Sequence, residues 1–159
     1  PNLVVLRTLS KAFALAGLRC GFTIASEVII QSLLKVIAPY PIPEPVAQIV
    51  AQALTAGNIE RMQQQVAFLN EQRTRLQAEL ATRPGVELVG DVKANYILFR
   101  HSHCAQIMQY LVSQGMLIRD QSKQLNLQNC LRVTIGSAEQ NQRLLSLLDA
   151  YFEQAGASL

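Results

Sequence analysis

Two isolated cations stand near the start of the chain, in a stretch that otherwise carries no charge. Lys11 follows a short apolar run, and Arg19 lies eight positions later, with only alanine, phenylalanine, leucine and glycine between them. A surface helix would spread its charges over one face, so this spacing indicates that each cation meets a particular anion or electrophile. Thr8 and Ser10 add two hydroxyls beside the lysine.

These four side chains suit a ligand that carries both a carbonyl group and a phosphate. A lysine in an apolar, cation-bearing pocket loses its proton more easily than its reference pKa of about 10.4 allows, and the neutral amine attacks a carbonyl to form a Schiff base. Thr8, Ser10 and Arg19 can bind a phosphate on the same ligand. Pyridoxal phosphate carries both groups. On position alone, a solvated lysine is the simpler interpretation of Lys11.

The elements around Lys11 are those of an α/β domain. Residues 3–6 are all apolar and predict a short strand buried on both faces, with Lys11 just past its carboxyl end, where ligands collect in open α/β sheets. A second strand is expected at 21–25, followed by a helix from Ser26, a good N-cap, to about residue 38.

A proline-rich segment and two helices follow. Residues 39–45 hold prolines at alternate positions and predict an extended connector. A helix is expected at 46–55, closed by Gly57 as its C-cap, and a long helix at 58–82, with Asn58 as its N-cap. The apolar stripe of the long helix indicates packing on its own domain more than an intermolecular coiled coil.

Strands and helices alternate from Pro84-Gly85 to the end of the chain, which predicts a small α+β unit. The expected strands are 86–89, 96–100, 116–119 and 131–135, and the expected helices are 104–113 and 138–154.

Composition excludes several classes of function. The 159 residues are 50% hydrophobic and 16% charged, with a net charge of +3 and no run of like charges, so neither nucleic-acid binding nor a polybasic membrane anchor is supported. Three widely spaced cysteines favour a reducing cytoplasm over a disulfide framework. The start in a core-like strand, without a signal peptide, indicates a piece of a longer polypeptide.

Two other patterns are weaker indications of a site. His101 and His103 lack partners at a recognisable metal spacing, and we expect two exposed loop histidines and no metal. Cys20 beside Arg19 has no nearby base, and we expect it to be a small buried hydrophobe.

The string TLSKAFALAGLRCGF, residues 8–22, with KVIAPYPIP after it, resembles the lysine signature of the class II pyridoxal-phosphate aminotransferases of fold type I. Within that family it is similar to the histidinol-phosphate branch, and the resemblance extends to about residue 152. It implies that residues 1–57 end a large α/β cofactor domain, that 58–82 form a connecting helix and that 83–159 form the small α+β carboxyl-terminal domain.

The resemblance also implies roles for individual residues. Lys11 matches the lysine that binds pyridoxal phosphate as a Schiff base and moves a proton during catalysis, while Thr8, Ser10 and Arg19 match ligands of the cofactor phosphate. Arg132 matches the arginine that fixes the anionic group of the substrate. Arg119 matches a second arginine that the histidinol-phosphate branch uses beside it.

Strand alternation is compatible with this role for Arg132. In 131–135 the apolar residues Leu131, Val133 and Ile135 fall on one face, so Arg132 and Thr134 fall on the other. Without the resemblance, a plain exposed strand face is the simpler interpretation. With it, we expect an anion clamp, because the planar guanidinium fork matches carboxylate and phosphate.

The implied reaction transfers an amino group from histidinol phosphate to 2-oxoglutarate, giving imidazole acetol phosphate and glutamate in histidine biosynthesis, in a cytoplasmic homodimer. The alternatives are an aromatic amino-acid transaminase, a pyridoxal-phosphate-dependent decarboxylase of the same fold and, in another class, a non-catalytic interaction module. The family places an aspartate against the cofactor ring, upstream of the lysine, and residues 1–10 contain no acidic residue. We therefore expect these 159 residues to be inactive alone.

Overall fold

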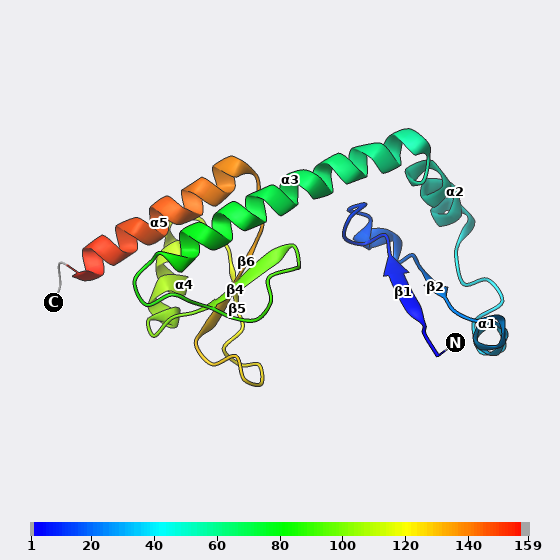
Figure 1. Ribbon diagram of the computed structural model, residues 1–159, viewed down its shortest axis with the longest axis horizontal. Helices are drawn as coiled ribbons and strands as arrows, with labels where there is room; N and C mark the ends of the chain where they lie inside the picture. The colour runs from blue at the N-terminus through cyan, green and yellow to red at the C-terminus, as the bar shows by residue number, and fades with distance from the viewer. Residues whose placement is uncertain (1, 157–159) are drawn as a thin grey trace. The chain divides into compact units, whose positions relative to one another are not determined.

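The computed structural model of the protein describes residues 2–156, in two compact units divided after Val66 (Figure 1). The first unit begins with strand β1 (Val5–Thr8), which pairs antiparallel with β2 (Gly21–Ile24). Thr8 lies opposite Gly21, and a Cβ atom at Gly21 would lie 2.6 Å from the carbonyl oxygen of Arg7. Glycine therefore lets the two strands meet closely at the start of the Lys11 loop.

The prediction of a buried strand at residues 3–6 is wrong in both position and burial. β1 lies two residues later, and the side chains of Leu3 and Leu6 are 71% and 75% exposed. Among residues 2–156, β1 hydrogen-bonds with β2 and no other strand. Burial on both faces requires neighbouring strands and layers on either side, so the apolar run stays at the surface.

The helices of the first unit follow their predicted order with different ends. Helix α1 (Glu27–Leu34) begins after Ser26 as predicted but ends about four residues early, and α2 (Glu44–Ala53) begins inside the proline-rich segment. Pro45 lies in the first turn of α2, where proline costs no hydrogen bond. The extended connector is therefore shorter than predicted.

The boundary between α2 and the long helix α3 (Ala56–Ala81) also differs from its prediction. Gly57 lies inside α3 instead of ending α2, and Asn58 is not the N-cap. The backbone carbonyl of Thr55 already accepts the N–H of residue 59 at 2.9 Å, which starts α3 earlier. The Asn58 side-chain amide instead donates to the carbonyl of Gln52 at 2.8 Å and so satisfies the end of α2.

The second unit is a four-stranded antiparallel sheet with helices packed on one face, in the strand order β3-β4-β6-β5. β4 and α4 have the predicted bounds, and β6 begins one residue earlier than predicted. The elements are β3 (Glu87–Leu88), β4 (Tyr96–Arg100), α4 (Cys104–Ser113), β5 (Arg119–Asp120), β6 (Cys130–Thr134) and α5 (Ala138–Gly156).

Strand β5 is shorter than the predicted 116–119 because the end of helix α4 uses the residues before it. Gly115 has φ of 72°, and the N–H of Met116 donates to the carbonyl of Leu111 at 2.8 Å. This closes the helix with a left-handed glycine, and the chain becomes free to pair as a strand only at Arg119.

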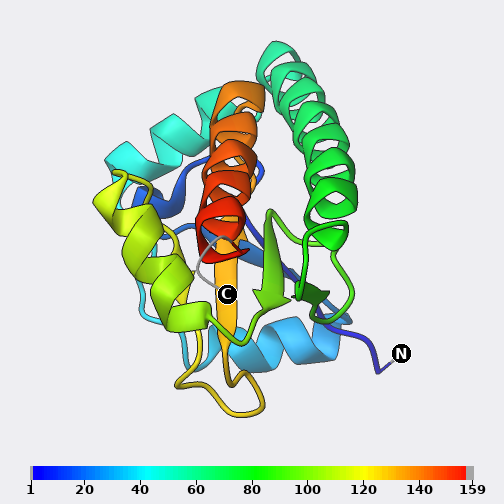
Figure 2. The ribbon, with the colours of Figure 1, turned by 90° about the vertical axis from the view of Figure 1, so that its left-hand side faces the viewer.

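The core of the second unit lies between the sheet and the helices α3, α4 and α5, which cover the same face (Figure 2). Fully burying a leucine or phenylalanine side chain stabilises a fold by roughly 1.5–3 kcal/mol. The many buried side chains therefore determine which face of the sheet the helices cover. The buried residues are Leu76, Leu80, Ile97, Phe99, Cys104, Ile107, Leu111, Leu131, Val133, Ile135, Leu144, Leu145 and Leu148.

The prediction of two exposed histidines holds for His103 and is wrong for His101. The His101 ring is buried, its Nδ1 accepts the backbone N–H of His103 at 2.9 Å, and its Nε2 lies 3.1 Å from the Pro84 carbonyl oxygen. A neutral ring with its proton on Nε2 satisfies both contacts, and burial lowers the pKa of His101. A Cβ atom at Gly85 would lie 2.7 Å from Nε2, so the ring packs directly against this turn.

The described part of the chain holds no group of three or more histidine, cysteine or acidic side chains placed to bind a metal. None of the helices in residues 2–156 is both long and apolar enough to cross a membrane.

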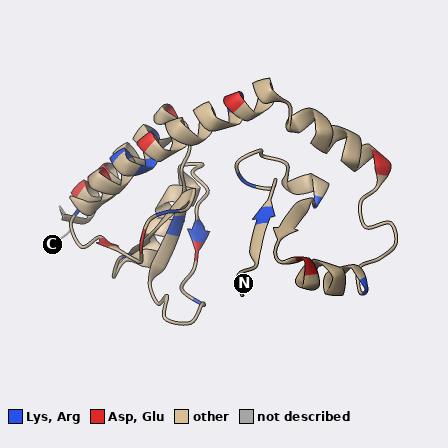
Figure 3. Cartoon of the chain, turned by 45° about the vertical axis from the view of Figure 1, so that its right-hand side comes forward, with Lys and Arg blue, Asp and Glu red and all other residues tan. Residues whose placement is uncertain are grey.

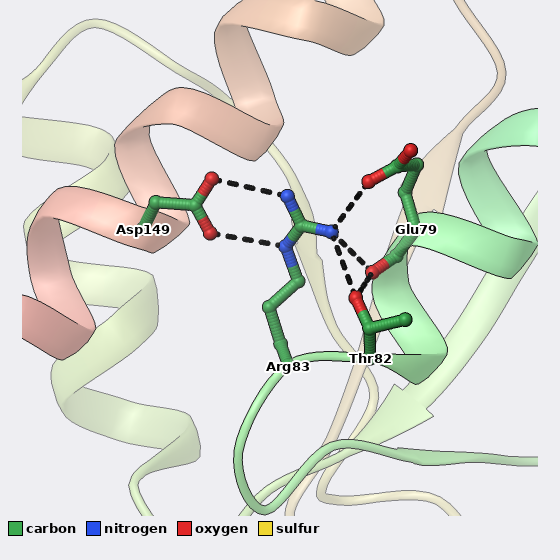
Figure 4. Close-up of polar contacts among 4 residues, drawn as sticks. All are labelled: Glu79, Thr82, Arg83 and Asp149. Carbon is green, nitrogen blue, oxygen red and sulfur yellow. Dashed lines mark hydrogen bonds and ion pairs between the residues drawn. The ribbon is translucent and has the colours of Figure 1, made fainter.

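Arg83 ties the end of α3 to α5 (Figure 4). Its Nε and Nη2 donate to the two carboxylate oxygens of Asp149 at 3.1 and 3.0 Å, while Nη1 donates to the Glu79 carboxylate at 3.0 Å and to the Glu79 carbonyl. The side chain is 10% exposed. A bidentate fork of this kind is stronger than an ordinary surface ion pair.

Replacement of Arg83 by glutamine is expected to lower the free energy of unfolding by about 1–2 kcal/mol, because Asp149 and Glu79 lose their shared partner. Urea unfolding followed by circular dichroism measures the change. Lys93→Gln is the matched control, since the Lys93–Asp91 pair is 3.8 Å apart and 78% and 80% exposed. A loss for Arg83→Gln no larger than that of the control would contradict a role for the fork.

Candidate cofactor and anion sites

The end of β1 places two predicted phosphate ligands side by side. Thr8 Oγ1 donates a hydrogen bond to Ser10 Oγ at 2.8 Å and accepts the backbone N–H of Ser10 at 3.1 Å. Such a local turn fixes both side chains relative to the backbone. The two hydroxyls therefore form one polar group at the start of the loop.

Two buried residues and their backbone hydrogen bonds fix the loop between β1 and β2. Leu9 is 2% exposed and Cys20 is 8% exposed, and the Leu9 N–H donates to the Cys20 carbonyl at 3.2 Å. The Leu15 N–H donates a hydrogen bond to the Leu9 carbonyl at 3.1 Å. Cys20 is thus the small buried hydrophobe that the sequence predicted, and the loop backbone has a defined path.

Lys11 lies at a turn of this loop, where its carbonyl accepts the N–H of Ala14 at 2.9 Å. Its side chain is exposed, and its amine makes no hydrogen bond or ion pair with any described residue. The expected apolar pocket around Lys11 is therefore not formed within residues 2–156. Among the apolar side chains of the loop, Leu9 and Cys20 are buried, while Phe13, Leu15 and Leu18 are only partly buried.

Arg19 ends the short 3-10 helix η1 (Ala16–Leu18) with φ of 52°, a left-handed conformation that is uncommon for arginine. Its Nη1 donates to the Ala16 carbonyl at 3.1 Å, which stabilises this end. The remaining guanidinium donors are available, since Arg19 is exposed. The structure thus brings Thr8 and Ser10 together and places Lys11 and Arg19 in the same loop without a bond to them.

Arg132 lies on the open face of the sheet, as alternation predicted. Its neighbours Leu131 and Val133 are 0% and 1% exposed beneath the helices, so Arg132 and Thr134 must point the other way. The Arg132 side chain is half-buried, and its Cζ lies 5.1 Å from the centre of the Tyr96 ring.

Arg119 lies directly opposite Arg132 in the antiparallel pair of β5 and β6. Residues opposite each other in such a pair share one face of the sheet, and like charges there are destabilising. Asp120 does not pair with them, because it lies opposite Leu131 and therefore on the other face of the sheet. Its carboxylate accepts the Ser122 N–H at 2.7 Å, and hydrogen bonds with the side chain and the backbone of Ser122 lower the pKa of Asp120. Within residues 2–156 neither arginine has an ion-pair partner. The pair is an uncompensated double cation suited to an anion.

A third arginine on this face, Arg100, serves the structure. Its Nη1 donates to the Glu87 carboxylate at 3.0 Å, and its other nitrogens donate to the carbonyls of Asn126 and Gln128 at 3.2 and 3.1 Å. Arg100 therefore holds the loop that joins β5 to β6. Figure 3 shows the basic positions on the strands of the sheet.

Sequence reasoning missed Arg100 and Tyr96 as neighbours of the arginine pair. Alternation in 96–100, with Ile97 and Phe99 buried, could have placed both on the face of Arg132. The order of the strands, which sets β4 beside β6, was not predicted.

Known proteins resemble the chain over nearly its whole length. A histidinol-phosphate aminotransferase of Pseudoalteromonas atlantica is 60% identical over 152 residues, which cover 96% of this chain and 41% of that protein. The chain therefore spans less than half the length of this relative.

Two solved structures share the fold. The histidinol-phosphate aminotransferase of Clostridium acetobutylicum gives a TM-score of 0.82 at 22% identity, over 96% of this chain and 46% of that one. That of Sinorhizobium meliloti, in complex with pyridoxal-5'-phosphate, gives 0.74 at 20% identity, over 95% and 42%. These likenesses confirm the predicted fold class.

Residues 1–148 match the family described as aminotransferase class I and II. The match includes the Lys11 loop, the proline-rich segment, the long helix, Arg119 and Arg132. As the motif around Lys11 predicted, the chain belongs to the class I and II aminotransferase family.

Proposed function

We propose that this chain is the carboxyl-terminal part of a histidinol-phosphate aminotransferase. The observation that carries the proposal is the uncompensated pair of Arg119 and Arg132 on one open face, which suits a doubly charged phosphate. The 60% identity to the histidinol-phosphate aminotransferase of Pseudoalteromonas atlantica supports the same substrate. In this proposal residues 1–57 form the end of the large cofactor domain, residues 58–82 form the helix that connects the two domains, and residues 83–159 form the small domain.

The residues of the Lys11 loop fit pyridoxal phosphate. The amine of Lys11 would bind its aldehyde carbon, while the paired hydroxyls of Thr8 and Ser10 and the guanidinium of Arg19 would hold its phosphate. When bound, this cofactor supplies an electron sink for breaking a bond at the substrate α-carbon. A structural neighbour is in complex with the same cofactor.

Lys11 is the proposed proton carrier of the reaction. Its amine makes no hydrogen bond or ion pair with the described residues, so it is available to accept a proton from the substrate α-carbon and to release that proton in a later step. A lysine serves this role when its surroundings favour the neutral amine. In this proposal those surroundings come from the parts of the enzyme that complete the site.

Arg119 and Arg132 would fix and orient the substrate. Histidinol phosphate, glutamate and 2-oxoglutarate all carry an anionic end, so one arginine pair can serve both half-reactions. The guanidinium forks present fixed donors, which orient an anion better than a flexible ammonium group does. The phosphate dianion gains most from two adjacent cations, and this favours the phosphorylated substrate.

The proposal includes a cytoplasmic homodimer whose site is completed outside this chain. The family needs an acidic residue against the cofactor ring, upstream of the lysine, and residues 1–10 supply none. The 159 residues alone are therefore expected to show no turnover.

The first test uses a polypeptide that joins this chain to the preceding part found in its relatives, loaded with pyridoxal phosphate. Histidinol phosphate, added without an oxo acid, is expected to convert the absorbance of the bound cofactor to that of pyridoxamine phosphate, and aromatic amino acids to do so far more slowly. Lys11→Ala is expected to abolish the conversion.

Three results would contradict the proposal in different ways. Faster conversion by phenylalanine or tyrosine would indicate an aromatic amino-acid transaminase. Release of carbon dioxide would indicate a decarboxylase. Failure of the polypeptide to bind the cofactor at all would favour a non-catalytic interaction module.

A second test addresses the arginine pair in the same enzyme. Arg132→Gln and Arg119→Gln are each expected to raise the KM for histidinol phosphate by about 10- to 100-fold, the effect of losing a hydrogen bond between charged groups. Arg61→Gln, which changes an exposed arginine of α3, is the matched control. Steady-state kinetics measure the change, and an unaltered KM in both variants would rule out the clamp.

A further inference from the structure

The Tyr96 ring is the one aromatic group that the described part of the structure places against a guanidinium of the arginine pair. Tyr96 begins β4 and lies opposite Thr134, so it is the diagonal neighbour of Arg132 on the open face. The Arg132 Cζ lies 5.1 Å from the ring centre, within the range of a cation–π interaction.

The repulsion between Arg119 and Arg132 makes an attractive contact to one of them favourable. Arg132 lies opposite Arg119 in the strand pair, and like charges in this arrangement repel each other. Leu98, the residue opposite Arg132 on the other neighbouring strand, offers no charge to attract it. The electron-rich face of the Tyr96 ring attracts a cation and also limits the orientations of a long side chain.

A purely structural role for Tyr96 is poorly supported. The residue is 38% exposed, whereas its strand neighbours Ile97 and Phe99 are fully buried in the core. Its hydroxyl makes no hydrogen bond with another described residue. The ring and not the hydroxyl therefore makes the contact that matters.

We propose that Tyr96 is a positioning residue for Arg132, which holds its guanidinium on the open face beside Arg119 in the orientation that binds an anion. The inference rests on the proposed function, because it assigns a task within the same anion site. Tyr96 acts through Arg132 and does not itself bind the anion.

Nuclear magnetic resonance of the 159-residue chain tests this inference without cofactor or turnover. The Nε–H signal of Arg132 is expected to show the upfield proton shift of a group held over an aromatic ring. Tyr96→Phe is expected to keep the shift, and Tyr96→Leu to remove it. A wild-type signal without this shift would overturn the inference, and that measurement needs no variant to fold.

Titration with inorganic phosphate supplies the functional half of the test. Tyr96→Leu is expected to weaken phosphate binding about two- to five-fold, the effect of losing a cation–π contact at an exposed site, while Tyr96→Phe binds as the wild type. In an Arg132→Gln background, Tyr96→Leu is expected to have no further effect, since the ring acts through Arg132.

The outcomes separate this inference from the function on which it rests. If Arg132→Gln leaves phosphate binding unchanged, the anion site itself is refuted. If Arg132→Gln weakens binding but Tyr96→Leu does not, the positioning role is refuted and the anion site stands. Equal losses in Tyr96→Phe and Tyr96→Leu would assign the effect to the hydroxyl and would also overturn the inference.

Discussion

The burial of Leu131 and Val133 beneath the helices of the second unit is the constraint on which the proposed anion site depends. Both side chains are excluded from solvent, and strand geometry then turns Arg132 to the opposite face. The antiparallel register of β5 and β6 places Arg119 beside it. A slip of one residue would send the arginines into the core, so the hydrophobic effect fixes the positions of the charges.

This arrangement keeps two cations together at an electrostatic cost. The Tyr96 ring attracts Arg132 and offsets part of this cost. Arg100 fixes the loop between β5 and β6 through two backbone carbonyls and so helps to hold the two strands in place. A site that holds uncompensated charge before its ligand arrives spends less free energy on reorganisation when the ligand binds.

The sequence predicted most of the second unit and less of the first. Periodicity fixed β4 and α4 to the residue, since their apolar faces pack within the unit. The prediction of a buried strand at residues 3–6 was wrong, because a fully apolar segment indicates burial but does not show which elements would cover it. Local hydrogen bonds, such as that from the Asn58 side chain to the Gln52 carbonyl, also determine where helices end. The helix propensities of single residues do not predict such bonds. His101 was misjudged because a buried histidine with two local partners resembles a loop histidine in sequence.

The position of a phosphate-like anion in crystals of the chain tests most directly whether Arg119 and Arg132 form an anion site. Tungstate is such an anion, and its anomalous scattering locates it without ambiguity. We expect a tungstate in contact with the guanidinium groups of both Arg119 and Arg132, with the Tyr96 ring still against Arg132. Crystals in which tungstate fills other sites while this pair stays empty, or in which the two arginines lie on opposite faces of the sheet, would contradict it.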